Sequence, residues 1–271
     1  MKILFSLLCF MLMSAKSFGG WEEALTFFPS KYPNGYYHQT ESAFMTVEDH
    51  FFVTQDGLKL HGWIAKPKKL KSDFWLLWFP GNGGNITHRF HWMEKMSCLP
   101  INIFIIDYRG YGRSEGKPTE PGIYKDAEAA YDYLTKKMLV PSAKIVILGE
   151  SLGGAPAIDL ASKAKCKALI AQSTFTTAKD MAKRIMPILP LWLIIKTKLD
   201  NLAKIQKITV PKLFIHSPAD EVVPYKLGRK LFNAAPPPKE FYEIPNAGHN
   251  ETYLVGGEQY FKTIHKFIYS N

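Results

Sequence analysis

Short apolar runs alternate along this chain with longer segments in which apolar positions recur every three or four residues. The runs have the length and β-branched content of strands buried on both faces of a parallel sheet, and the longer segments are typical of covering helices. Strands are predicted at residues 44–54, 58–65, 74–79, 101–107, 145–148, 168–172, 212–217 and 240–244. Helices are predicted at residues 86–96, 121–137, 155–161, 225–233 and 251–269. This order predicts an α/β fold with a mostly parallel central sheet flanked by helices.

Two segments depart from the alternation. Residues 18–43 are rich in aromatic residues, Pro and Gly, which predicts an irregular lead-in packed against a domain of residues 44–271. Residues 175–200 contain a run that is apolar on all sides and is interrupted by Pro187 and Pro190. This run is either a buried helical insertion or a cap whose apolar walls receive a substrate. The same apolar surface could also enter a membrane interface.

Residues 1–17 have the pattern of a signal peptide. Lys2 supplies a positive start, residues 3–13 form an apolar core, and Ala15 and Ser17 are small residues suited to cleavage. The run is short for a membrane span, although an uncleaved anchor is the alternative. We therefore expect an exported protein, periplasmic or secreted, or one anchored to a membrane by this segment.

The predicted strand at residues 145–148 leads into a Gly-x-Ser-x-Gly sequence, residues 149–153, and then into a helix. A strand, this turn and a helix together describe a nucleophile elbow. A side chain at Gly149 or Gly153 would collide with a neighbouring strand or helix, so the turn requires glycine there. Ser151 is the predicted nucleophile, and the backbone N–H of Leu152 is a predicted oxyanion donor.

A serine nucleophile needs a base, and histidine serves best near neutral pH. His249 is preferred among the eight histidines because it follows the last strand, at the same sheet edge as the elbow. Asp220 follows the strand at 212–217 and is the predicted acid that orients the imidazole. The adjacent Glu221 is expected to point away, and Asp200 is a weaker rival beside the cap.

Several motifs together resemble the α/β-hydrolase superfamily over about residues 44–267. More narrowly, the chain is similar to the α/β-hydrolase-domain protein depalmitoylases and their bacterial serine-aminopeptidase-like relatives. The residues that carry this resemblance are Asp56-Gly57, Leu60-His61-Gly62-Trp63, Pro80 to Asn85, Asp107 to Gly112, Ser114-Glu115-Gly116, the Ser151 elbow, Asp220 before Val223-Pro224, and Gly248-His249. The resemblance implies an α/β-hydrolase fold and no metal or organic cofactor. One position departs from the family, which usually has His where this chain has Pro80.

The glycine-rich turn after the strand at 74–79 is the second predicted part of the oxyanion site. In α/β-hydrolases this loop supplies an N–H donor, and Asn82 is the candidate here, although a plain flexible turn is the alternative. The predicted substrate-binding residues are two glycines of this loop and three side chains of the cap: Gly81, Gly83, Phe175, Leu189 and Trp192.

Charge and cysteine content change this picture little. The net charge is +10 in 271 residues, but there is no Arg-rich cluster or nucleic-acid motif, so no nucleic-acid partner is expected. Cys98 and Cys166 have no metal-ligand spacing and are taken as small buried residues, with a disulfide between them left open.

Taken together, the motifs and the apolar cap predict a serine hydrolase that cleaves a small-molecule or lipidated ester or thioester. The alternatives are a peptidase-like hydrolase and a binding protein on the same fold.

Overall fold

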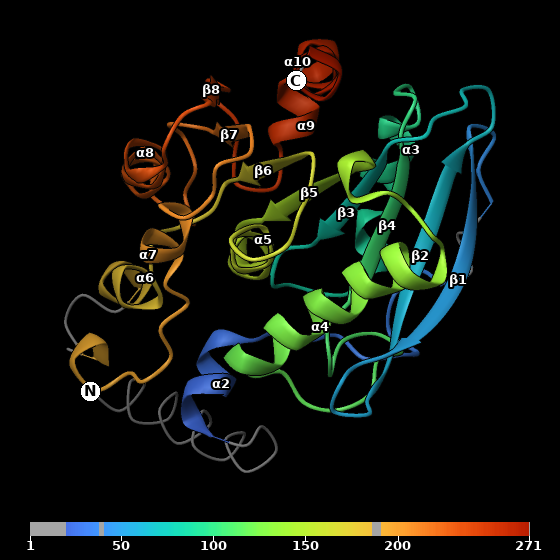
Figure 1. Ribbon diagram of the computed structural model, residues 1–271. Helices are drawn as coiled ribbons and strands as arrows, with labels where there is room; N and C mark the ends of the chain where they lie inside the picture. The colour runs from blue at the N-terminus through green and yellow to red at the C-terminus, as the bar shows by residue number, and fades with distance from the viewer. Residues whose placement is uncertain (1–19, 38–40, 186–190, 271) are drawn as a thin grey trace.

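An eight-stranded sheet forms the centre of the computed structural model, which describes residues 20–37, 41–185 and 191–270 (Figure 1). The strand order is β1-β2-β4-β3-β5-β6-β7-β8. β1 pairs antiparallel with β2, β2 pairs antiparallel with β4, and every other neighbouring pair is parallel. The strands are β1 (Met45–Val53), β2 (Lys59–Pro67), β3 (Trp75–Phe79), β4 (Asn102–Asp107), β5 (Ile145–Glu150), β6 (Ala168–Gln172), β7 (Lys212–His216) and β8 (Lys239–Glu243). The predicted mostly parallel α/β architecture is confirmed.

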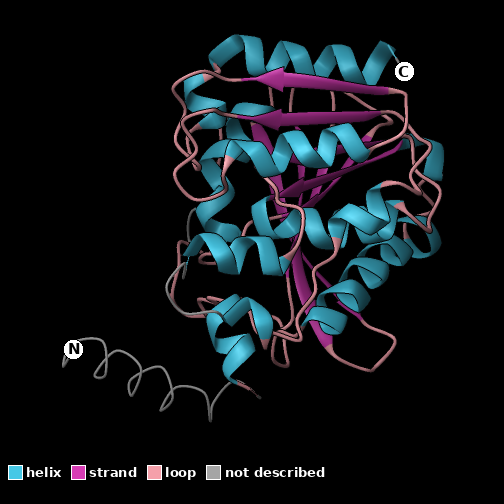
Figure 2. Ribbon diagram, turned by 90° about the vertical axis from the view of Figure 1, so that its left-hand side faces the viewer, coloured by secondary structure: helices cyan, strands magenta, loops and turns pink. Residues whose placement is uncertain are grey.

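Helices cover both faces of this sheet (Figures 1 and 2). One core packs α4 (Glu120–Asp132), α5 (Gly154–Ala161), α7 (Asn201–Ile205) and α8 (Tyr225–Ala234) against the sheet. The other core contains side chains of α3 (Phe90–Met96) and α10 (Gly257–Ser270). Neighbouring residues of β3 alternate between the two cores, because successive side chains of a strand point to opposite faces.

Helix boundaries differ from the predicted ones at several places. The lead-in is not wholly irregular, since it contains α2 (Trp21–Thr26) before its Pro- and Gly-rich part. The predicted helix at 121–137 ends in a wider π turn, Tyr133–Lys137. The predicted closing helix is two helices, α9 (Thr252–Val255) and α10, because Gly257 has φ of 50°.

The two cysteines of the described chain are both free thiols. Cys166 is buried, as predicted, but Cys98 is exposed. The prediction was wrong for Cys98 because it follows the end of α3, in a turn that faces solvent.

The predicted cap at about residues 175–200 contains α6 (Ala178–Ile185) and the short 3₁₀ helix η6 (Leu191–Leu193). Residues 186–190, with both prolines, and the predicted signal segment 1–17 lie outside the described residues. Within the described parts of the chain, no helix combines the length and apolar character needed to cross a bilayer.

The turn between β5 and α5 has almost no free space around its glycines. An ideal Cβ on Gly149 would lie 2.5 Å from the Gly153 oxygen and 2.6 Å from Cβ of Ala157. A Cβ on Gly153 would lie 2.0 Å from the oxygen of Phe79 in β3. The sequence-based reason for these glycines, collision with a strand or helix, is confirmed.

Replacing Gly153 with Ala should lower the free energy of unfolding by about 1–3 kcal/mol, because the added carbon would overlap the backbone of β3. Urea unfolding followed by circular dichroism measures the loss. Gly83→Ala is the matched control, since a Cβ there would meet nothing within 4 Å. Equal losses in the two variants would contradict the packing argument.

Candidate active site

Ser151 lies at the carboxyl edge of the sheet, directly after β5. It opens the 3₁₀ turn η5 (Ser151–Gly153) with φ of 52°, a left-handed backbone conformation that a non-glycine residue rarely adopts. The hydroxyl of Thr174, just beyond β6, donates a hydrogen bond of 2.8 Å to the carbonyl oxygen of Ser151. Thr174 thus holds this strained turn from the end of the neighbouring strand.

The structure brings Ser151, His249 and Asp220 together from three loops beyond β5, β8 and β7. Nε2 of His249 lies 2.9 Å from Oγ of Ser151, and Nδ1 lies 2.8 Å from Oδ2 of Asp220. A carboxylate can only accept, so Nδ1–H donates to Asp220 and Nε2 is left to accept the serine proton. The arrangement has the geometry of a Ser-His-Asp triad.

Asp220 is held as an anion by four donors. The N–H groups of Val222 and Val223 donate to Oδ1 at 2.9 and 2.8 Å, and His216 joins His249 at Oδ2, 3.2 Å from its Nε2. Burial would raise the pKa of Asp220, but the hydrogen bonds from His216 and His249 outweigh it and place the pKa below its ordinary value. His216 is buried at the end of β7, and its contact with Asp220 was not predicted from the sequence.

The two rival carboxylates have other roles. Glu221 was expected to point away from the site, which is wrong in part: its carboxylate accepts a hydrogen bond from the backbone N–H of His249 at 3.0 Å. This contact fixes the loop that carries the imidazole without touching the ring. Asp200 caps α7 by accepting from the N–H of Ala203.

The glycine-rich loop after β3 is fixed by the side chain of Asn82. Its amide nitrogen donates to the carbonyl of Thr26 at 2.6 Å, and its amide oxygen accepts from the N–H of Phe28 and the hydroxyl of Tyr111 at 3.0 and 2.7 Å. The lead-in therefore buttresses the predicted oxyanion loop. Leu152 lies in the first turn of η5, where N–H groups have no partner within the helix.

An ion pair further connects this loop to the elbow. Arg89 donates to both carboxylate oxygens of Glu150 at 3.1 and 3.3 Å and to the carbonyl of Gly83 at 2.9 Å. Both side chains are nearly buried, 12% and 8% exposed. This brace and the bond of 2.9 Å from the Tyr108 hydroxyl to the Pro80 carbonyl hold a loop that lacks the family's usual histidine.

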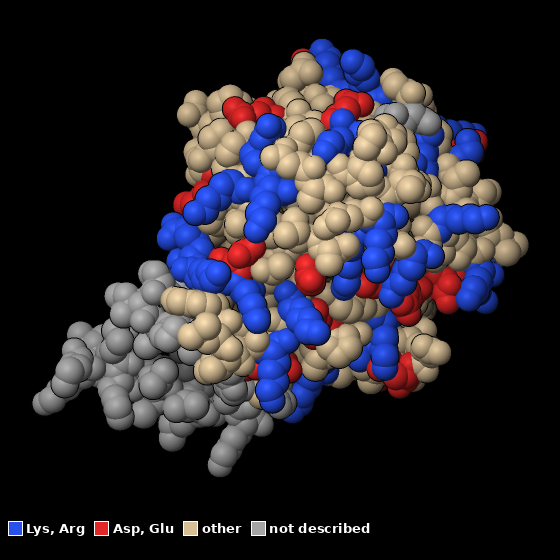
Figure 3. Space-filling model, turned by 60° about the vertical axis from the view of Figure 1, so that its left-hand side comes forward, with Lys and Arg blue, Asp and Glu red and all other residues tan. Residues whose placement is uncertain are grey.

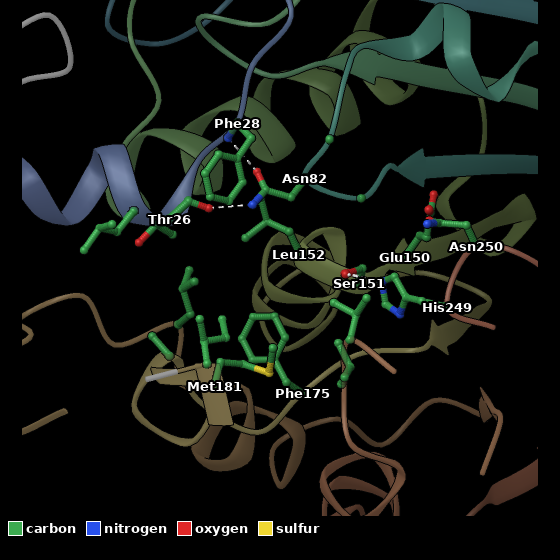
Figure 4. A pocket seen from close by; sticks show the side chains of 18 of the residues that line it. Thr26, Phe28, Asn82, Glu150, Ser151, Leu152, Phe175, Met181, His249 and Asn250 are labelled. Atoms are coloured by element: carbon green, nitrogen blue, oxygen red, sulfur yellow. Dashed lines mark hydrogen bonds between the residues drawn. The ribbon is translucent and has the colours of Figure 1, made fainter. Parts of the chain in front are cut away.

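A cavity of about 660 Å³ opens beside Ser151 and His249. Phe28 and Asn82 lie on one side of it and Phe175 and Met181 on the opposite side (Figure 4). Its lining residues include these and further apolar residues of α2 and the cap: Leu25, Ala178, Ala182, Ile185, Ile195 and Leu199. The apolar wall therefore comes from two segments that are far apart in the sequence.

The predicted substrate-binding residues divide into three groups. Gly81, Gly83 and Phe175 line the cavity, as proposed from the sequence. Trp192 does not line it, because η6 places this half-buried ring outside the cavity wall. Leu189 lies outside the described residues.

Several residues of the site were not predicted from the sequence. The lead-in contributions of Leu25 and Phe28 carry no local motif that could have revealed them. Glu150 was visible inside the elbow sequence, but its partner Arg89 lies 61 positions away. Among the described residues, no group of three or more His, Cys, Asp or Glu side chains could hold a metal ion.

Comparison with known proteins places the chain in a family. A family model described as "alpha/beta hydrolase fold" matches residues 75–194. The chain is 35% identical over 243 residues to the alpha/beta hydrolase domain-containing protein WAV2 of Arabidopsis thaliana, covering 83% of this chain and 79% of the relative. It is also 35% identical over 257 residues to protein bem46 of Schizosaccharomyces pombe, covering 90% and 85%. The chain belongs to the α/β-hydrolase family and is a hydrolase.

Solved structures agree with this fold. The Pyrococcus furiosus esterase Pf2001 is similar with a TM-score of 0.73, covering 90% of this chain and 96% of that structure. The sequence identity is 21%, so the likeness concerns the fold.

Replacing Arg89 alone with Met should lower the free energy of unfolding by about 3–5 kcal/mol, because it leaves the Glu150 carboxylate buried without its partner. The double variant Arg89→Met/Glu150→Gln should recover most of this loss. Urea unfolding of both single variants and the double variant measures the coupling. If the losses of the two single variants simply add in the double variant, Arg89 and Glu150 do not act as a pair.

Stability should also report the ionised state of Asp220. A lowered folded pKa contributes stability above the ordinary value of 3.8 and loses it as pH falls toward the folded pKa. The free energy of unfolding of wild type should therefore exceed that of Asp220→Asn by a constant amount from pH 7 to about 5, and the difference should shrink below about 4. Urea unfolding at these pH values tests this, with Asp132→Asn as control, since the Asp132 side chain is 49% exposed. A difference in the free energy of unfolding that grows on acidification would contradict a lowered pKa of Asp220.

Proposed function

We propose that this hydrolase cleaves carboxylic esters or thioesters with an apolar acyl group, using Ser151 as nucleophile, His249 as base and Asp220 as the residue that orients it. The observation that carries the proposal is the continuous hydrogen-bonded line from Ser151 through His249 to Asp220 at the wall of an apolar cavity. The similar Pyrococcus furiosus protein is named an esterase, which supports ester chemistry here.

In this mechanism Oγ of Ser151 attacks the acyl carbonyl while Nε2 of His249 takes its proton. The backbone N–H groups of Leu152 and Asn82 receive the negative charge that develops on the carbonyl oxygen. His249 then gives the proton to the leaving alcohol or thiol. Water, activated by the same imidazole, attacks the acyl-enzyme, releases the acid and returns the hydroxyl to Ser151.

The cavity favours an acyl chain over a peptide. Its size lies in the range that accommodates a small organic ligand, and the side chains of α2 and the cap that line it are mostly apolar. A peptidase of free amino termini would need an unpaired carboxylate in the site. Glu22 and Glu150 line the cavity, but Glu22 accepts from the N–H groups of Lys196 and Thr197, and Glu150 is paired with Arg89.

Ser151→Ala should reduce hydrolysis of p-nitrophenyl esters by at least about 10⁴-fold, because the acyl-enzyme can no longer form. The wild-type enzyme should prefer medium or long acyl chains over acetate, because the apolar walls of the cavity contact the longer chain. The measurement is kcat/KM across a series of p-nitrophenyl esters of increasing chain length.

Met181→Trp tests the acyl site within the same series, because a larger ring would narrow the cavity at the cap. It should lower kcat/KM for long chains and spare acetate. Leu139→Trp, at a residue 78% exposed and outside the cavity lining, is the control. Activity that survives in Ser151→Ala would refute the nucleophile, and an equal loss on all chain lengths in Met181→Trp would refute the acyl site.

A further inference from the structure

The mouth of the cavity is rimmed by apolar side chains that face solvent. Phe28, Ile185 and Val222 all line the cavity, yet they are 59%, 63% and 43% exposed. They come from the lead-in, the end of α6 and the loop after β7, so the rim is assembled from three separate segments. An exposed apolar rim that continues into an apolar cavity indicates a surface that meets an apolar partner.

The cap extends this apolar rim. Leu193 and Ile194 are 73% and 61% exposed, whereas the next residue, Ile195, turns inward to line the cavity. The chain thus crosses from solvent to the cavity wall within three residues. We call Phe28, Ile185, Leu193, Ile194 and Val222 the apolar rim.

Two carboxylates fix the segment that presents this part of the rim. Glu22 of α2 accepts hydrogen bonds from the backbone N–H groups of Lys196 and Thr197 at 2.9 and 2.8 Å. Glu120, at the start of α4, accepts from those of Lys198 and Leu199 at 2.6 and 2.7 Å. Side chains of α2 and α4 hold four successive N–H groups, so the segment that follows Leu193 and Ile194 is fixed in place.

Basic side chains accompany the part of the apolar rim that the cap supplies. Five exposed residues of the cap carry positive charge: Lys179, Lys183, Arg184, Lys196 and Lys198. Within the part of the chain that the structure describes, none of these five side chains makes an ion pair. Figure 3, in which the left-hand side of Figure 1 is turned toward the viewer, shows many more Lys and Arg than Asp and Glu side chains. Ala178, Met181 and Ala182 of α6 line the cavity, whereas the basic residues of the same helix are exposed to solvent.

We propose that this face docks onto an anionic phospholipid bilayer, with the basic residues against the headgroups and the apolar rim in the interface. Each Lys or Arg near an anionic surface adds to binding, and the exposed apolar side chains leave water on insertion. The inference rests on the proposed function, since the docked cavity would receive a lipid-like ester directly from the bilayer. A second copy of this chain fits less well, because two basic caps would repel each other.

The test uses the full chain and vesicles of phosphatidylcholine with or without phosphatidylglycerol. Brominated lipids quench tryptophan that reaches the bilayer, and Trp192 lies in η6 beside the exposed Leu193. Quenching should be stronger in wild type than in Trp192→Phe, and the difference isolates the cap from any contribution of residues 1–17. This difference should require phosphatidylglycerol and weaken as salt rises.

Two surface variants and one control separate the basic residues of the cap from the apolar rim. Lys183→Glu/Arg184→Glu should reduce vesicle-dependent Trp192 quenching about tenfold at a fixed lipid concentration, and Leu193→Ser/Ile194→Ser should reduce it similarly. Lys137→Glu/Leu139→Ser changes an exposed basic and an exposed apolar residue before the amino end of β5, at the opposite edge of the sheet, and should leave it unchanged. All three variants should keep wild-type kcat/KM on a soluble short-chain ester.

The outcomes distinguish this inference from the proposed function. Equal quenching in wild type and Trp192→Phe, or quenching unaffected by both surface variants, would overturn the docking face while soluble ester hydrolysis stands. Equal quenching on vesicles with and without phosphatidylglycerol would overturn the anionic partner. Loss of soluble ester hydrolysis in the surface variants, matching the loss of quenching, would assign the residues to folding of the cap instead.

Discussion

The close packing of the elbow against β3 is the constraint on which the site depends. Gly153 approaches the carbonyl of Phe79 so closely that no side chain fits between them, and β5 and β3 are neighbours in the sheet. This contact holds the turn in which Ser151 adopts φ of 52°. Without it the serine could relax to an ordinary backbone conformation, and its hydroxyl would leave the line to His249.

Buried and half-buried charged side chains mainly hold the loops at this sheet edge in place. Asp220 accepts two backbone N–H groups as well as the imidazole of His249. Asp107 accepts the N–H of Ile86 after the predicted oxyanion loop and also contacts the buried ring of His61. A carboxylate suits this role because bonds from N–H groups to an anion are stronger than those to a neutral oxygen. These hydrogen bonds fix the irregular loops, which the regular hydrogen bonds of a strand or helix do not hold.

The proposed acyl site and the proposed docking face favour the same kind of substrate. Side chains of α2 and the cap build an apolar wall, and some of the same segments continue outside as the exposed apolar rim. A water-soluble substrate would gain little from such a rim, whereas an acyl chain leaving a bilayer would remain in apolar surroundings along its path. The predicted oxyanion loop and the lead-in are joined through Asn82, so the cavity wall of the lead-in and the loop near Ser151 form one structure.

Local pattern determined the fold class, the strands within one or two residues, and the placing of Ser151, Asp220 and His249 at one edge. These followed because parallel strands end at a common edge and a tight turn admits only glycine at Gly149 and Gly153. Tertiary structure alone decided that α2 lines the cavity, that Trp192 lies outside it, and that Arg89 pairs with Glu150. Each of these depends on which distant segments meet, and short-range periodicity carries no record of such pairings.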